Sequence, residues 1–149
     1  MWLFLPASFL SVVAARHLKI SGQPVDPDRL VVRARMRVHL DALQERHLDL
    51  LAGCAITEDR ARDYRFRLLV GKPAFAEVMK REVLALVHTN FKSEVERVNG
   101  FDAEYARACH RVWGEMLPLQ EPRRDRGQRD RMWREHKDDD RGGDGLDHL

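Results

Sequence analysis

The stretch MWLFLPASFLSVVAAR (residues 1–16) decides the fold, because it is either a targeting segment or part of the folded domain. A secretory signal begins with basic residues and continues with an uninterrupted apolar segment. No Lys or Arg precedes Arg16, and Pro6 and Ser8 interrupt an apolar run that is too short to span a membrane. We therefore predict two buried strands joined by a turn, in a cytoplasmic protein. Secretion is the alternative if Met1–Ala15 is a cleaved signal.

The segment RLVVRARM (residues 29–36) alternates between apolar and charged residues. Successive side chains of a strand point to opposite faces, so Arg33 and Arg35 share one face with Val31. The other face is apolar and carries Leu30, Val32, Ala34 and Met36. This alternation predicts a strand with one side on the core and the other side in solvent.

The segment DYRFRLLV (residues 63–70) alternates in the same way. Arg65 and Arg67 are expected on one face of this strand, and Tyr64 and Phe66 on the opposite, apolar face. If this strand and the preceding one are neighbours in a sheet, their four arginines meet on its open face. We therefore predict a cluster of guanidinium groups there.

Apolar residues that recur with a 3.6-residue period predict helices over about residues 36–51, 73–87, 91–98 and 102–117. Asn90 is expected to cap the third of these helices, because an Asn side chain accepts backbone N–H groups at a helix start. Two intervening segments, Lys19–Asp28 and Thr57–Arg62, are rich in breaker or charged residues. Both are predicted to be loops.

The composition changes sharply at Glu121. From this residue to Leu149, 17 of the 29 residues are charged, and the two signs are mixed. Such a segment cannot bury enough apolar surface to offset the entropy lost on ordering. We therefore predict a single domain over residues 1–120 and a disordered polyampholyte tail over residues 121–149.

The whole-chain composition is typical of a globular protein with a polar surface, since 44% of its residues are hydrophobic and 34% are charged. The net charge of +2 gives no general attraction to nucleic acid or to membranes. Cys54 and Cys109 form no CxxC pair, which excludes a zinc ribbon or a thioredoxin-type motif. Two reduced, structural thiols are expected.

Together, these segments predict an α+β fold. We expect a mostly antiparallel sheet of about four strands, with helices packed on one face. The arrangement of layers is ferredoxin-like, and the patterns leave the connectivity of the strands open.

The motifs MWLF, FLSVV, LVVRAR, DYRFRLLV, NFK and a late VW follow one another between Met1 and Leu119. In this order they resemble a group of small, uncharacterised bacterial proteins. The resemblance implies a soluble bacterial protein without a signal peptide, and it implies no activity. The loop with Pro24 and Pro27 is longer than the resemblance leads us to expect, and the charged tail is an extension.

The strongest functional candidate is a site for an anionic ligand or an acidic partner on the arginine face. The candidate ligand-binding residues are Arg33, Arg35, Arg65, Arg67, Asn90 and Lys92. Each guanidinium fork can donate two parallel hydrogen bonds to a carboxylate or phosphate. Asn90 and Lys92 join the site only if their loop reaches around the sheet. The alternative is a solvated face on which the arginine stems cover apolar surface.

A second hypothesis is a homo-oligomeric structural protein. The segment Trp2–Val13 is apolar on both faces, so it is either central in the sheet or covered by a second copy, as in a homodimer. Nucleic-acid binding is not expected, because the exposed aromatic platforms that sequence-tolerant binding uses are missing beside the arginines. Sequence-specific recognition is not expected either, since no RNP-like motif or helix-turn-helix signature is present.

A third hypothesis is an enzyme, which needs a pocket that collects Asn90, Lys92, Tyr64 or a histidine. The sequence indicates no catalytic residue, cofactor or metal site. His39 and His47 are eight positions apart, which is too far for one metal ion on a helix. Motifs such as GxGxxG, HExxH and the Walker loop are absent from the sequence.

Overall fold

A computed structural model describes residues 1–17, 22–100 and 103–119 of the chain. The tail predicted over residues 121–149 lies outside the described residues. The chain divides into two compact units, Met1–Cys109 and His110–Leu149. All the strands belong to the first unit, and the described part of the second is the end of one helix with a short 3₁₀ turn.

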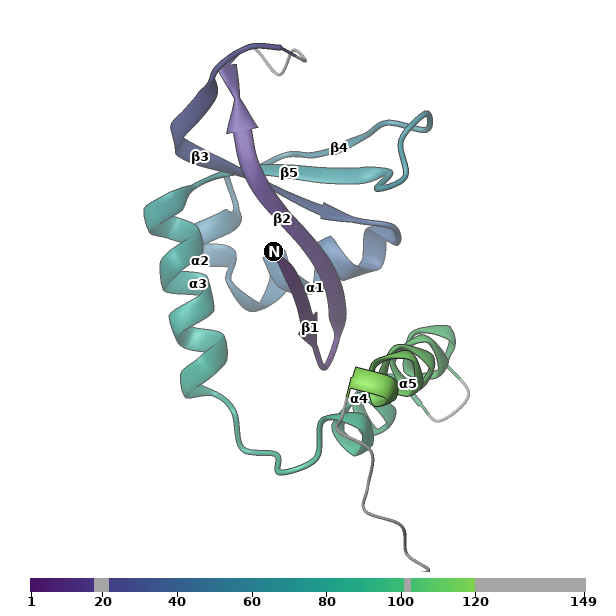
Figure 1. The fold of residues 1–149 in the computed structure, drawn as a ribbon. Coiled ribbons are helices and arrows are strands. Elements are labelled where there is room, and N and C mark those ends of the chain that lie inside the picture. The colour runs from purple at the N-terminus through teal and green to yellow at the C-terminus, as the bar shows by residue number, and fades with distance from the viewer. Residues whose placement is uncertain (18–21, 101–102, 120–149) are drawn as a thin grey trace, which may run out of the picture. The chain divides into compact units, whose positions relative to one another are not determined.

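One antiparallel sheet forms the centre of the first unit, with the strand order β1-β2-β3-β5-β4 (Figure 1). The strands are β1 (Trp2–Leu5), β2 (Ser8–Arg16), β3 (Val25–Ala34), β4 (Ile56–Glu58) and β5 (Phe66–Gly71). The predicted α+β class with an antiparallel sheet is therefore confirmed. The fifth strand is β4, which begins the segment Thr57–Arg62 that was expected to be a loop. Its backbone pairs with β5, although its residues show no strand alternation.

The start of β3 corrects the second loop prediction, because the strand begins inside the segment Lys19–Asp28. The register between β2 and β3 shifts between Ala14 and Arg16, which marks a bulge. Pro27 lies in this irregular part, where its missing N–H breaks no regular ladder. The buried Asp26 carboxylate accepts a backbone N–H two residues further on, which stabilises the turn of the chain.

The described helices are α1 (Arg37–Arg46), α2 (Leu48–Leu51), α3 (Lys72–Leu84), α4 (Phe91–Asn99), α5 (Glu104–Met116) and the 3₁₀ helix η2 (Leu117–Leu119). The single helix expected over residues 36–51 is broken at His47, whose φ of −129° and ψ of 42° lie outside the helical region. Its buried ring lies 2.6 Å from Glu82 of α3, measured from Nε2 to Oε1. Satisfying this buried carboxylate fixes His47 where an uninterrupted helix would continue.

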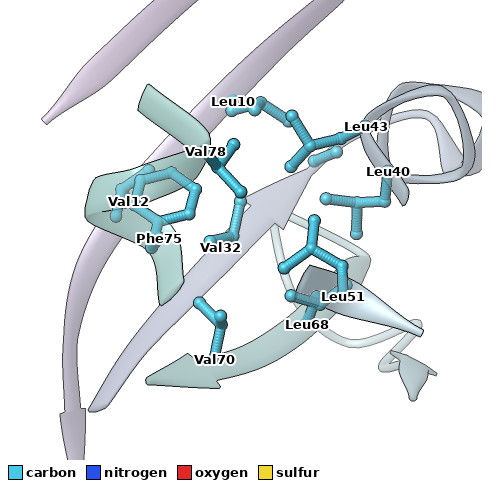
Figure 2. Packing of buried hydrophobic residues seen from close by; sticks show 11 residues of the cluster. Leu10, Val12, Val32, Leu40, Leu43, Leu51, Leu68, Val70, Phe75 and Val78 are labelled. Carbon is cyan, nitrogen blue, oxygen red and sulfur yellow. The ribbon is translucent and has the colours of Figure 1, made fainter. Parts of the chain in front are cut away.

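The main hydrophobic core lies between one face of the sheet and helices α1, α2 and α3. Figure 2 shows its buried side chains, which come from both layers and point toward one another. The strands contribute Leu10, Val12, Val32, Ala34, Leu68 and Val70, and the helices contribute Leu40, Leu43, Leu51, Phe75 and Val78. Alternation along β2, β3 and β5 then directs the intervening side chains to the other face of the sheet.

The opening stretch of the chain forms β1 and β2, as predicted. On one face, Leu3 and Leu5 pack against the main core. On the other face, Phe4 and Phe9 pack against a second cluster that contains Val95, Tyr105, Ala106 and Cys109. These contacts cover part of each face of the hairpin within the chain, while Trp2 is 65% exposed and Val13 36% exposed. The homodimer stays a prediction.

Across residues 1–17, 22–100 and 103–119, no helix combines the length and the apolar character needed to cross a bilayer.

Candidate functional site

A row of four polar side chains crosses the face of the sheet that lies opposite the main core. Ser11, Arg33, Arg67 and Thr57 occupy directly opposed positions on β2, β3, β5 and β4. The expectation that the two arginine-bearing strands are neighbours is confirmed for β3 and β5. The pairing register therefore places Arg33 and Arg67 side by side.

The guanidinium group of Arg33 is held from two sides. Its Nη2 donates a hydrogen bond to the Ser11 hydroxyl oxygen at 2.8 Å. Its Cζ lies 4.9 Å from the centre of the Tyr64 ring, which gives a cation–π contact. Its Nε is buried and has no hydrogen-bond partner within the described chain. Arg33 is thus fixed in position while most of its N–H groups are not used by the protein.

Arg67 is also placed by a backbone contact rather than by a carboxylate. Its Nε donates to the carbonyl oxygen of Tyr64 at 3.3 Å. Neither Arg67 nor Arg33 forms an ion pair within the described ranges of the chain. Two like charges directly opposite one another on adjacent strands repel and lower stability. An anion bound between them removes this repulsion.

Arg35 and Arg65 have a different environment. Arg35 forms an ion pair with Asp63 at 3.0 Å, and its Cζ lies 5.2 Å from the Tyr64 ring. Arg65 pairs with Glu58 and lies over the ring of Phe66. Hydrogen bonds from Arg65 and Arg60 hold the pKa of Glu58 below its usual value. The predicted cluster of four therefore divides into two arginines with carboxylate partners and two that have none among the described residues.

A groove of about 490 Å³ lies along the same face. Its lining residues are Val13, Ala14, Ala15, Arg16, Val31, Arg33, Gly53, Cys54, Ala55, Thr57, Arg62, Arg67 and Leu69. Four of them are arginines and none is acidic. Arg62 contacts Asp59 at 3.5 Å, and Arg16 donates to the carbonyl oxygen of Gln23 at 2.8 Å. Among the described residues, the lining of the groove is consequently positive, and Arg16, Arg33 and Arg67 have no carboxylate partner there.

Apolar residues form a second row in the groove, beside the polar one. Val13, Val31 and Leu69 are directly opposed on β2, β3 and β5, two residues along each strand from the polar row. Two residues of a strand span about 7 Å. The groove therefore presents a charged row and an apolar row side by side in fixed register, and Arg16 lies beyond the apolar row on β2.

The structure places Asn90 and Lys92 apart from this groove, and neither lines it. Asn90 is the N-cap of α4, and its side-chain oxygen accepts the backbone N–H groups of Lys92 at 3.1 Å and Ser93 at 3.3 Å. The predicted capping role is confirmed. The carboxamide oxygen is occupied by the helix start, which explains this Asn without a ligand.

The predicted orientation of Tyr64 was wrong. Its ring lies beside Arg33 and Arg35, on the arginine face, because β5 begins only at Phe66 and the strand alternation does not extend to Tyr64. The ring is only 7% exposed. It supports the guanidinium groups from below and is not an open platform for stacking a base.

The histidines discussed from the sequence are buried structural residues. Burial lowers the pKa of His39, whose Nδ1 lies 3.4 Å from the backbone nitrogen of Phe9. Neither His39 nor His47 lines the groove. Within the described ranges, no three His, Cys, Asp or Glu side chains are close enough together to hold a metal ion.

Of the residues that line the groove, only Arg33 and Arg67 were predicted as site residues, and the charged or hydroxyl-bearing ones that were missed are Arg16, Arg62 and Thr57. Arg62 belongs to the connection between β4 and β5, and Arg16 ends β2 beside a bulge. Thr57 lies on the short β4, which has no alternation to reveal it. Position along the chain gives no direction for side chains in such segments, so no sequence signal identifies them.

Comparison with known proteins adds no assignment: no protein-family model, curated protein or solved structure matches the chain. The function is therefore inferred from the groove itself.

Proposed function

We propose that this protein binds a small anionic ligand in the groove, with Arg33 and Arg67 as the principal ligand-binding residues. The observation that carries the proposal is the direct opposition of these two side chains without a carboxylate partner in the described chain. Two adjacent cations repel one another, and a counter-ion bound between them relieves this repulsion. Arginines without partners in a concave site are a common way of binding anions.

The geometry suits a carboxylate or a phosphate. Guanidinium groups present paired N–H donors that match two oxygens of such a group. The Ser11 hydroxyl fixes Arg33, and the Tyr64 carbonyl fixes Arg67, so little side-chain entropy is lost when a ligand binds. Arg62 and Arg16 also line the groove and add further guanidinium groups to it.

The test is a titration with inorganic phosphate followed by NMR shifts of backbone amides. The double variant Arg33→Gln/Arg67→Gln is compared with Arg35→Gln/Arg65→Gln, which has the same net charge. We expect the first variant to lose about tenfold or more in affinity, since hydrogen bonds to charged groups contribute about 1.5–3 kcal/mol each. The second should change the affinity by less than about threefold, because exposed, paired charges contribute little. Equal losses in both variants would show general charge attraction and no site.

We also propose a cytoplasmic location, which rests on two observations. Cys54 and Cys109 are free thiols, as is usual in a reducing compartment. The residues that a signal peptidase would remove carry Leu10 and Val12 of the main core. Fractionation of cells that express the chain would test the location, and mass spectrometry would show whether Met1–Ala15 is retained.

A further inference from the structure

We infer that the ligand of the groove is amphiphilic: a carboxylate or phosphate head at Arg33 and Arg67 joined to an apolar body over Val13, Val31 and Leu69. This inference rests on the proposed function and adds the class of ligand to it. Its basis is the register of the sheet, which places a charged row and an apolar row side by side in one groove.

The apolar row needs an explanation of its own. The helices α1, α2 and α3 pack on the opposite face of the sheet, where the main core lies. Val13 is nevertheless an aliphatic residue on the interior strand β2, and it is 36% exposed. Val31 lies opposite Val13, and Leu69 lies opposite Val31. Both are also incompletely buried. A solvated sheet face normally carries polar residues, so this row is suited to an apolar part of a ligand.

The lining also limits what the body of the ligand can be. Among the residues that the structure describes, no acidic side chain lines the groove, so this lining offers no counter-charge for a cation. One row carries the polar side chains of Ser11, Arg33, Arg67 and Thr57, and the neighbouring row of Val13, Val31 and Leu69 offers no side-chain hydrogen-bonding group. Arg16 and Arg62 line the groove outside these two rows. A sugar or another polyol would leave its hydroxyl groups unpaired over that row. A short alkyl or aryl body fits it without this cost.

The size of the groove agrees with a small ligand. Its volume of about 490 Å³ lies in the range usual for sites of small organic molecules. The rows are about 7 Å apart along the strands, which corresponds to a chain of a few methylene groups between head and tail. A ligand with roughly six carbon atoms would reach from one row to the other.

The experiment measures the affinity of the full chain for acetate, hexanoate, inorganic phosphate and hexyl phosphate by calorimetry or NMR titration. We expect hexanoate to bind at least about tenfold more tightly than acetate, which corresponds to about twofold for each added methylene. The affinity for hexyl phosphate should exceed the affinity for inorganic phosphate by a similar factor. The comparison of the two hexyl ligands shows which head group the arginines prefer.

Matched variants assign the gain to the apolar row. Val13→Thr/Val31→Thr keeps the strand-forming shape of both residues and adds hydroxyl groups to the groove. It should lower the ratio of hexanoate to acetate affinity by about threefold or more. Val25→Thr, on an exposed position of β3 outside the groove, should leave this ratio unchanged. Circular dichroism of each variant checks the fold.

Two results would overturn the inference, and they are distinguishable. If phosphate binds at Arg33 and Arg67 but hexanoate and acetate bind equally, the apolar body is wrong and the proposed function stands. If none of the four probes binds, the proposed function fails as well. The chain-length series uses the unmodified protein, so a variant that does not fold cannot obscure either result.

Discussion

Arg33 and Arg67 differ from Arg35 and Arg65 in what surrounds them, although all four lie at equivalent alternating positions in the sequence. Arg35 and Arg65 each pair with a carboxylate near the surface. Arg33 and Arg67 oppose one another across two adjacent strands, and neither has an acidic partner in the described chain. The placement of counter-charges, and not the alternation, therefore separates a solvated face from a candidate anion site.

The largest effect is expected at Tyr64, which contacts both groups of arginines. Its ring is 7% exposed and lies near Arg33 and Arg35. Replacing Tyr64 with Ala should lower the free energy of unfolding by about 3 kcal/mol, as is usual when a buried aromatic side chain is removed. Tyr64→Phe keeps the ring and should unfold nearly like the unmodified protein in urea. A loss below about 1 kcal/mol for Tyr64→Ala would show that the ring does not hold the arginines in place.

The next effect concerns Asn90, which the sequence assigned to the site and the structure assigns to a helix start. Asn90→Ala should lower the free energy of unfolding by about 1 kcal/mol, because two backbone N–H groups of α4 lose their acceptor. The same variant titrated with phosphate should bind it like the unmodified protein. A phosphate affinity changed by more than about threefold would return Asn90 to the site and weaken the comparison.

The smallest effect is a pH dependence at Glu58, the partner of Arg65. Hydrogen bonds from Arg65 and Arg60 lower the pKa of Glu58 in the folded chain. The ionised Glu58 therefore stabilises the folded chain at pH values above the ordinary glutamate pKa of about 4.3. This stabilisation is lost as the pH falls through the lower pKa that Glu58 has in the folded state. The free energy of unfolding of Glu58→Gln should fall less steeply between about pH 5 and pH 3 than that of the unmodified protein, as measured by denaturation at each pH. Identical slopes in both proteins would indicate that the pairing seen at Arg65 is not maintained in solution.

The sequence identified the parts of the fold that have regular periods. Alternation predicted the strands that contain Arg33 and Arg67, and it predicted that both side chains share a face with Val31. Helical periodicity and a cap residue predicted α4 at Asn90. These patterns are local, because they follow from burying one side of a strand or helix.

The features of the fold and of the site that the sequence did not predict depend on contacts between distant segments. His47 lies at the break between α1 and α2, and its ring reaches Glu82, which lies 35 residues further along the chain. The short strand β4 forms only because β5 offers it an edge. Glu58 of that strand then forms an ion pair with Arg65, and no sequence pattern around either residue predicts this pair. Counter-charges are placed by the tertiary structure, so the sequence could not divide the four arginines into two groups.

The most direct test of the central claim is the stability of Arg67→Gln, measured by thermal unfolding without phosphate and then with phosphate. Removing one of two opposed cations relieves repulsion, so we predict that the variant is at least as stable as the unmodified protein in phosphate-free buffer. Phosphate should raise the unfolding temperature of the unmodified protein and not that of the variant, because a ligand stabilises only the state that binds it. A variant that is less stable without phosphate, and is stabilised by phosphate to the same extent as the unmodified protein, would contradict the claim.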